Sequence, residues 1–185
     1  SKHNETAALD SYHRSITRIV KAFNQTEHIN LLNGVLDLET LQLLPHSPEF
    51  YSTIQIPLEY DPAATCPRFD QFLLEISCED KELVGLLQEM TGYFLCHHTK
   101  AEKAFLFYGS GCNGKSVMAK LVTHLVGQDN VSGVPLSKFG ETFALASLVN
   151  KNLNIAAENE LATKFNSENF KAIVSGDSMN IQRKY

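Results

Sequence analysis

The sequence contains no tryptophan, and its four cysteines stand far apart, at positions 66, 78, 96 and 112. No two of them form a C-x-x-C motif, so the sequence indicates neither a zinc ribbon nor a disulfide scaffold. No apolar run approaches the roughly 20 residues of a membrane-spanning helix, and no signal-peptide pattern is present. We therefore expect reduced thiols in a soluble, cytoplasmic protein.

An excess of positive charge is also missing, because the 185 residues carry a net charge of −5. The two halves differ, however. Residues 1–99 hold 6 Lys and Arg against 14 Asp and Glu, a balance of −8, whereas residues 100–185 hold 10 against 7, a balance of +3. This asymmetry suggests two units with different partners. We place the domain boundary in the polar segment 97–102, which gives domains 1–99 and 100–185.

The first domain is expected to be mainly helical. Apolar residues at helical spacing predict helices over 8–26, from Pro67 onward, and over about 80–97. Between the first two, Asn33-Gly34 and Glu39-Thr40 predict chain reversals. The alternating segment 52–58 predicts a short strand.

The second domain is expected to alternate strands and helices. The continuous apolar run 104–108 is typical of a strand buried on both faces. Helical patterns follow over 115–126 and 142–149, and 153–157 predicts a second short strand. Asn166 or Ser167 can cap a last helix that ends near Gly176.

One stretch between the first strand and helix of this domain has the spacing of a phosphate-binding P-loop, G-x-x-x-x-G-K-S/T. It comprises Gly109, Ser110, Gly111, Cys112, Asn113, Gly114, Lys115 and Ser116. Glycines let the backbone turn tightly, so that successive N–H groups and the positive end of the next helix face phosphate oxygens. The loop predicts binding of ATP with Mg²⁺, in which catalytic Lys115 reaches the β- and γ-phosphates and Ser116 ligates the metal.

Two weaker interpretations of the same glycines stay open. Gly109, Gly111 and Gly114 also fit the dinucleotide pattern G-x-G-x-x-G, and Asp129 lies 20 residues beyond Gly109, where an acid could hold a ribose. Asp129 does not close a clear strand, however. The other interpretation is a glycine-rich turn without a ligand. The Lys-Ser pair directly after the third glycine favours the P-loop.

A P-loop also needs an acid at the tip of a neighbouring strand to organise magnesium and water. Glu158 directly follows the apolar run 153–157 and is the expected acid on the metal side. Glu160 is expected to polarise the attacking water. Asn159 could orient that water instead, and the two glutamates could exchange roles. A solvated acidic loop is the alternative.

Several stretches together resemble the phage and plasmid primase–helicases, whose motor belongs to the viral-type superfamily III helicases of the AAA+ class. The form G-x-G-x-N-G-K-S, with Asn113 before Gly114, is similar to that family's own P-loop. The resemblance starts near residue 28 and also rests on Asn33–Leu38, Pro45–Pro48, Tyr60–Pro62, Cys66–Phe69, Gly92-Tyr93, Ala157–Glu160, Phe170-Lys171, Ser175–Asp177 and Ile181–Tyr185.

The resemblance implies an α/β chain: a mostly helical domain, then the first part of an AAA+-like ATPase domain with a parallel sheet. It implies the motor of a replicative DNA helicase that works as a homo-oligomeric, hexameric ring on single-stranded DNA, with a primase domain or protein as a further partner. In that family the C-terminal segment leads into a DNA-contacting hairpin, which makes Lys171, Arg183 and Lys184 the expected contacts. The family's sensor asparagine and arginine finger would follow Tyr185, so the chain is expected to be a truncated motor.

Two other functions remain open at this point. A catalytically incomplete fragment could act only as a nucleotide- or partner-binding module. A P-loop kinase is the other alternative, although the sequence shows no obvious acceptor-binding lid.

Overall fold

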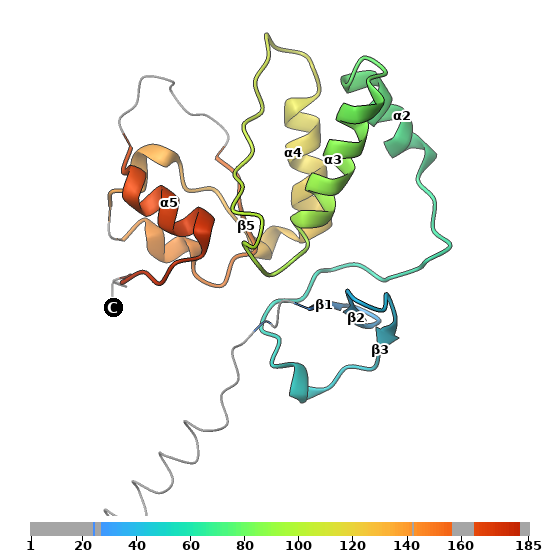
Figure 1. Ribbon diagram of the computed structural model, residues 1–185, viewed down its shortest axis with the longest axis horizontal. Coiled ribbons are helices and arrows are strands. Elements are labelled where there is room, and N and C mark those ends of the chain that lie inside the picture. Colours follow the sequence, from blue (N-terminus) through green and yellow to red (C-terminus); the bar gives the residue numbers. More distant parts are fainter. Residues whose placement is uncertain (1–23, 25–26, 142, 157–164, 182–185) are drawn as a thin grey trace, which may run out of the picture.

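The computed structural model describes residues 24, 27–141, 143–156 and 165–181. Over these residues the chain is a mixed α/β structure with a three-stranded antiparallel sheet and a two-stranded parallel sheet. Figure 1 shows α2, α3 and α4 grouped together, with the antiparallel sheet below them and α5 to one side. The elements are β1 (His28–Leu31), β2 (Gly34–Asp37), β3 (Leu43–Leu44), η1 (Pro48–Phe50), α2 (Pro67–Ile76), α3 (Lys81–Tyr93), α4 (Lys115–Val126), η2 (Gln128–Asn130), β4 (Val131–Ser132), η3 (Leu136–Lys138), η4 (Leu145–Leu148), β5 (Leu153–Asn154) and α5 (Ser167–Ser175).

The antiparallel sheet begins with the hairpin that the Asn33-Gly34 signal predicts. Leu31 pairs with Gly34, so the chain reverses between β1 and β2 through Leu32 and Asn33. Gly34 must be a glycine because β3 approaches closely: an added Cβ would lie 2.6 Å from the Leu44 carbonyl oxygen. The sheet lies inside the region that we expected to be mainly helical. Of the expected helix 8–26, all but Asn24 lies outside the described residues.

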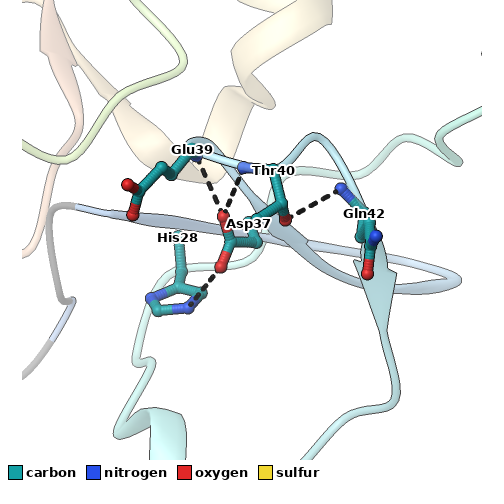
Figure 2. Close-up of polar contacts among 5 residues, drawn as sticks. All are labelled: His28, Asp37, Glu39, Thr40 and Gln42. Carbon is teal, nitrogen blue, oxygen red and sulfur yellow. Dashed lines mark hydrogen bonds and ion pairs between the residues drawn. The ribbon is translucent and has the colours of Figure 1, made fainter.

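The second reversal, predicted at Glu39-Thr40, is built on the carboxylate of Asp37 (Figure 2). Asp37 Oδ1 accepts hydrogen bonds from the backbone N–H of Glu39 at 2.9 Å and of Thr40 at 2.8 Å. The Thr40 backbone hydrogen bond contributes most to lowering the pKa of Asp37, and the His28 imidazole, 3.8 Å from Oδ2, acts in the same direction. The turn therefore keeps Asp37 ionised and leads the chain into β3.

Segment 52–58, predicted as a strand, is extended but is not a regular strand. It runs beside β1 through two backbone hydrogen bonds: Ile56 N–H donates to the Asn30 carbonyl, and Leu32 N–H donates to the Leu58 carbonyl, each at 2.8 Å. Pro57 lies between these two bonds and has no N–H to donate, which breaks the ladder. The alternation itself is real, because Ile54 and Ile56 are buried.

The helices α2 and α3 begin where the sequence signals place them. Pro67 is the first residue of α2. Asp80 caps α3 by accepting hydrogen bonds from the N–H groups of Glu82 and Leu83. Helix α3 ends at Tyr93, four residues earlier than predicted, in hydrogen-bonded turns at Leu95 and Cys96. No helix among the described residues is long and apolar enough to cross a membrane.

The main hydrophobic core draws on both sides of the boundary expected near residue 99. The antiparallel sheet, the extended segment after it, α2 and α3 supply seven buried members, and α4 supplies three. The buried members are Ile29, Leu31, Leu36, Ile56, Leu73, Leu87, Met90, Met118, Val122 and Val126. The division into domains 1–99 and 100–185 thus stays a prediction, with α4 packed in the same core as the sheet, α2 and α3.

A second, smaller cluster surrounds α5. Val134, Phe139 and Leu145 are its buried members, and Phe170 and Ile173 of α5 pack against them. Asn166 caps α5 by accepting a hydrogen bond from Asn169 N–H, and α5 ends at Gly176, as predicted. The helix predicted over 142–149 is reduced to the single 3-10 turn η4, for which the structure shows no side-chain cap.

Candidate functional site

The P-loop lies directly before α4, at the upper end of that helix in Figure 1. Three of its residues adopt left-handed backbone conformations: Gly111 with φ of 108°, Cys112 with φ of 50° and Gly114 with φ of 84°. Left-handed residues turn the chain sharply, and alternating hands of backbone conformation can point successive N–H groups into one concavity. Gly114 then becomes the N-cap of α4, and its carbonyl accepts the first helical hydrogen bond, from Met118 N–H at 2.8 Å.

Helix α2 packs against the loop at its third glycine. A Cβ added to Gly114 would lie 2.5 Å from Cγ2 of Ile76 and 3.4 Å from Cε2 of Phe72. Gly114 is therefore fixed twice, by its left-handed φ and by the apolar face of α2. The amphipathic pattern after Pro67 predicts the helix, but nothing local in the sequence shows that its last turn contacts the loop.

Lys115, the first residue of α4, turns its side chain back into the loop. Its Nζ donates to the Gly109 carbonyl oxygen at 3.1 Å and to Asn113 Oδ1 at 2.5 Å. The ammonium group thus lies among loop atoms, where the sequence pattern predicts a positive charge. Ser116 is exposed in the first turn of α4, so its hydroxyl is accessible to a metal ion. These positions suit an anionic phosphate with a metal beside it.

The strand expected to carry the acids is the second strand of a parallel pair. Val131 of β4 pairs with Leu153 of β5, and Ser132 pairs with Asn154. Asn154 ties the pair together, because its Oδ1 accepts from Ser132 Oγ at 2.9 Å and from Val134 N–H at 2.8 Å, and its Nδ2 donates to the Val134 carbonyl at 2.9 Å. Glu158, Asn159 and Glu160, which follow β5, lie outside the described residues.

The prediction of a buried strand over 104–108 is wrong for the described structure. The segment is irregular, and four of its side chains are 37 to 85% exposed: Phe105, Leu106, Phe107 and Tyr108. Phe105 packs edge-to-face on Phe94 at the end of α3, with 5.3 Å between the ring centroids. An apolar run becomes a strand only where neighbouring strands supply hydrogen bonds, and among the described residues β4 and β5 pair only with each other.

Of the residues expected to contact DNA, Lys171 alone lies in the described part of the chain. It is exposed on α5. The stretch Ser175–Asp177 forms the C-terminal cap of that helix: Gly176, with φ of 74°, donates its N–H to the Ile173 carbonyl, and Asp177 N–H donates to the Ala172 carbonyl. Arg183 and Lys184 lie outside the described residues.

Two known families match this chain. Residues 14–78 match the family described as D5 N terminal like, and residues 107–185 match a family of unknown function (DUF5906). The first match covers the antiparallel sheet and α2, and the second covers the P-loop, β5 and α5. The chain belongs to the D5-like primase–helicase family of phages and plasmids. The resemblance drawn from the sequence motifs is thereby confirmed.

In this primase–helicase chain, His97 belongs to the segment between the two matched regions. It contacts residues near β1 on one side and the residue before β5 on the other. His97 and the amide of Asn152 form a hydrogen bond, in which the imidazole Nδ1–H faces Asn152 Oδ1. The amide is oriented by its own Nδ2, which donates to the Phe94 carbonyl at 2.6 Å. His97 and His28 of β1 line the same cavity of about 10 Å³. Desolvation is the main cause that lowers the pKa of His97, which favours the neutral ring.

These contacts are the part of the site region that sequence reasoning missed. No spacing rule relates His97 to Asn152, because the two residues are 55 positions apart and meet only in the folded chain. The Asn113–Lys115 hydrogen bond was also missed, although both residues were expected in the loop. Asn113 and Lys115 are two positions apart in the sequence, at the start of a helix. The backbone turn at Gly114 allows the Asn113 amide to accept a hydrogen bond from the Lys115 ammonium group.

Proposed function

We propose that this primase–helicase chain carries the ATP-binding and ATP-hydrolysing part of a replicative DNA helicase motor. The observation that supports it most is the Lys115 ammonium, turned back among the loop atoms at the start of α4 with left-handed residues at 111, 112 and 114. A lysine held inside a turned loop at a helix N-terminus suits a nucleotide phosphate chain, which is a dense anion. An AAA+-like ATPase domain, with β4 and β5 as part of its parallel sheet, is the architecture we propose around it.

In this mechanism the protein mainly positions groups and stabilises charge. The loop N–H groups and Lys115 would hold the phosphates, and Ser116 and Glu158 would hold Mg²⁺, which would supply positive charge beside the phosphates. Glu160 orients the attacking water. The exposed Ser116 hydroxyl suits its assigned role because it is accessible beside the lysine.

We further propose that the motor acts on single-stranded DNA as a hexameric ring. Lys171, Arg183 and Lys184 would contact DNA phosphates, which carry most of the affinity in such complexes. The positive balance of residues 100–185 supports this assignment, whereas the acidic balance of residues 1–99 suits other partners. The boundary near residue 99 is part of the same proposal.

The test of the nucleotide site is Lys115→Ala. Removing the ammonium group should weaken binding of a non-hydrolysable ATP analogue at least about tenfold, which is the scale of a charge-assisted contact. Isothermal titration calorimetry measures this affinity. Lys120→Ala is the matched control, because it removes the same charge from an exposed position on the same helix and should keep the wild-type affinity.

Equal affinity in the wild-type and Lys115→Ala proteins would contradict the nucleotide assignment. A phosphate-release assay on the same proteins separates the motor from its alternatives. Hydrolysis that increases with single-stranded DNA supports the helicase motor. Tight binding without any hydrolysis, with DNA present and in a protein extended beyond Tyr185 to include the expected arginine finger, would instead favour a module that only binds nucleotide.

A further inference from the structure

The side chain of Asn113 contacts two other residues of the loop, Gly109 and Lys115. A Cβ added to Gly109 would lie 1.9 Å from Asn113 Nδ2 and 3.3 Å from Lys115 Nζ. Both polar side chains therefore lie against the α-carbon of Gly109, at the opposite end of the loop from the helix. The ammonium group donates to Asn113 Oδ1 and to the Gly109 carbonyl, so its donors are directed to protein atoms of the loop.

We propose that Asn113 holds the loop closed on itself without nucleotide, and that an incoming phosphate must displace the Asn113 amide from the Lys115 ammonium. This proposal rests on the nucleotide-binding function proposed above. It assigns to Asn113 a positioning role. The amide is a placeholder that keeps the Lys115 side chain directed into the loop, and a phosphate oxygen, which is a stronger acceptor, replaces it.

The chemistry of the amide suits a reversible partner. An asparagine oxygen is neutral, so its hydrogen bond to an ammonium group is weaker than that of an anionic phosphate oxygen. Asn113 is exposed and Lys115 only half-buried, so solvent can replace either partner during the exchange. A carboxylate at the same position would form an ion pair with Lys115 and also repel a phosphate, which would resist the exchange twice.

Gly109 is the residue that makes room for this arrangement. Because Gly109 lacks a side chain, the Asn113 amide can lie over the Gly109 α-carbon. The Gly109 carbonyl at the same time accepts a hydrogen bond from Lys115. The first glycine of the loop thus makes the contact between Asn113 and Lys115 possible. Any larger residue at 109 would push the amide away from Lys115.

The experiment compares Asn113→Ala and Asn113→Asp with the wild-type protein by stopped-flow binding of a fluorescent ATP analogue. Asn113→Ala removes the placeholder and should raise the association rate about three- to tenfold, the scale of one ordinary, solvent-accessible hydrogen bond. Asn113→Asp should lower the association rate by at least about tenfold. A slower association rate in Asn113→Ala would overturn the proposal, because it would make the amide a direct phosphate ligand.

A second measurement needs no nucleotide. Labelling with an amine-reactive acylating reagent, followed by mass spectrometry, reports how accessible the Lys115 amine is, and Lys120 is the internal standard. Labelling of Lys115 relative to Lys120 should rise about threefold or more in Asn113→Ala and fall in Asn113→Asp, on the same hydrogen-bond scale. Unchanged ratios in both variants would overturn the Asn113–Lys115 contact. If no protein binds the analogue but the labelling ratios shift as expected, the contact stands and the proposed ATP function fails.

Discussion

At Gly114, two independent constraints act on a single residue. Its φ of 84° lies in the left-handed region, and the space where a Cβ would stand is occupied by Ile76 of α2. Gly114→Ala should lower the free energy of unfolding by about 1–3 kcal/mol, the cost of a strained left-handed residue with a forced contact. Denaturant unfolding followed by circular dichroism measures the change.

The matched control is Gly85→Ala in α3. Nothing lies within 4 Å of a Cβ built at Gly85, and the residue is inside a helix. Alanine there should raise the free energy of unfolding by about 0.5–1 kcal/mol, because it reduces the entropy of the unfolded chain and favours the helix. The two substitutions therefore have opposite expected signs, and a stabilising Gly114→Ala would contradict the packing of α2 on the loop.

At His97, the depressed pKa makes stability depend on pH. The ring is desolvated, and His98, its neighbour in the chain, further disfavours its charge. His28, which lines the same cavity, is near Asp37. As pH falls below the reference value of 6.5, the unfolded chain binds a proton more readily than the folded one, so the free energy of unfolding falls toward acid.

His97→Gln tests this dependence. Glutamine cannot take up a proton, so the slope of the free energy of unfolding between about pH 5 and 6.5 should become shallower, by at most about 1.4 kcal/mol per pH unit. Urea unfolding at a series of pH values measures the slope. A slope identical to that of the wild-type protein would show that His97 does not contribute to it.

At the scale of elements, the side chain of Asn154 supplements the backbone hydrogen bonds that join the parallel pair β4–β5. Asn154 makes three hydrogen bonds across the pair. Asn154→Ala should cost about 2–3 kcal/mol in the free energy of unfolding, because the N–H and carbonyl groups of Val134 lose their partner in a half-buried site, whereas the Ser132 hydroxyl keeps the Leu153 carbonyl as an acceptor at 3.4 Å. Gln88→Ala, at an exposed position of α3, should change it by less than about 0.5 kcal/mol. Chemical denaturation of the two variants decides between a structural role for Asn154 and a passive one.

The elements also show what sequence can and cannot predict. The hairpin at Asn33-Gly34 and the end of α5 at the Gly176 cap depend on neighbouring residues, and both predictions are confirmed. Segment 104–108 fails because strand formation depends on partners far along the chain. The loop before Lys115 is predictable only in part. Its backbone turns follow from its glycines, whereas the sequence does not predict its contact with Ile76 of α2.

At the scale of the whole molecule, α4 couples the loop to the rest of the protein. Its first residue is Lys115, and its buried side chains share a core with the antiparallel sheet, α2 and α3. At its other end, Asn130 Nδ2 donates to the Gln55 carbonyl at 2.7 Å. One helix and the turn after it thus join the loop to the D5-like N-terminal region. The sequence predicts the helix but not this connection, because every contact in it joins distant positions.

The charge asymmetry of the molecule leads to the last prediction, which concerns DNA. The double replacement Arg183→Ala/Lys184→Ala should weaken binding of single-stranded oligonucleotides to a similar extent for all base sequences, because phosphate contacts carry no base information. Each lost phosphate contact should reduce the slope of log affinity against log salt by about 0.7. Fluorescence anisotropy at several salt concentrations measures affinity and slope together.

The matched control removes the same two charge types from the acidic region. Arg68→Ala/Lys81→Ala changes two exposed residues, at the first turns of α2 and α3, and should leave the salt slope unaltered if DNA contacts only the basic region. ATP affinity should survive in both double variants, since the loop and Lys115 are intact. A slope that is unchanged in Arg183→Ala/Lys184→Ala would remove the C-terminal segment from the DNA path. Equal reductions in the two double variants would mean that DNA is held by net charge alone, without a defined contact surface.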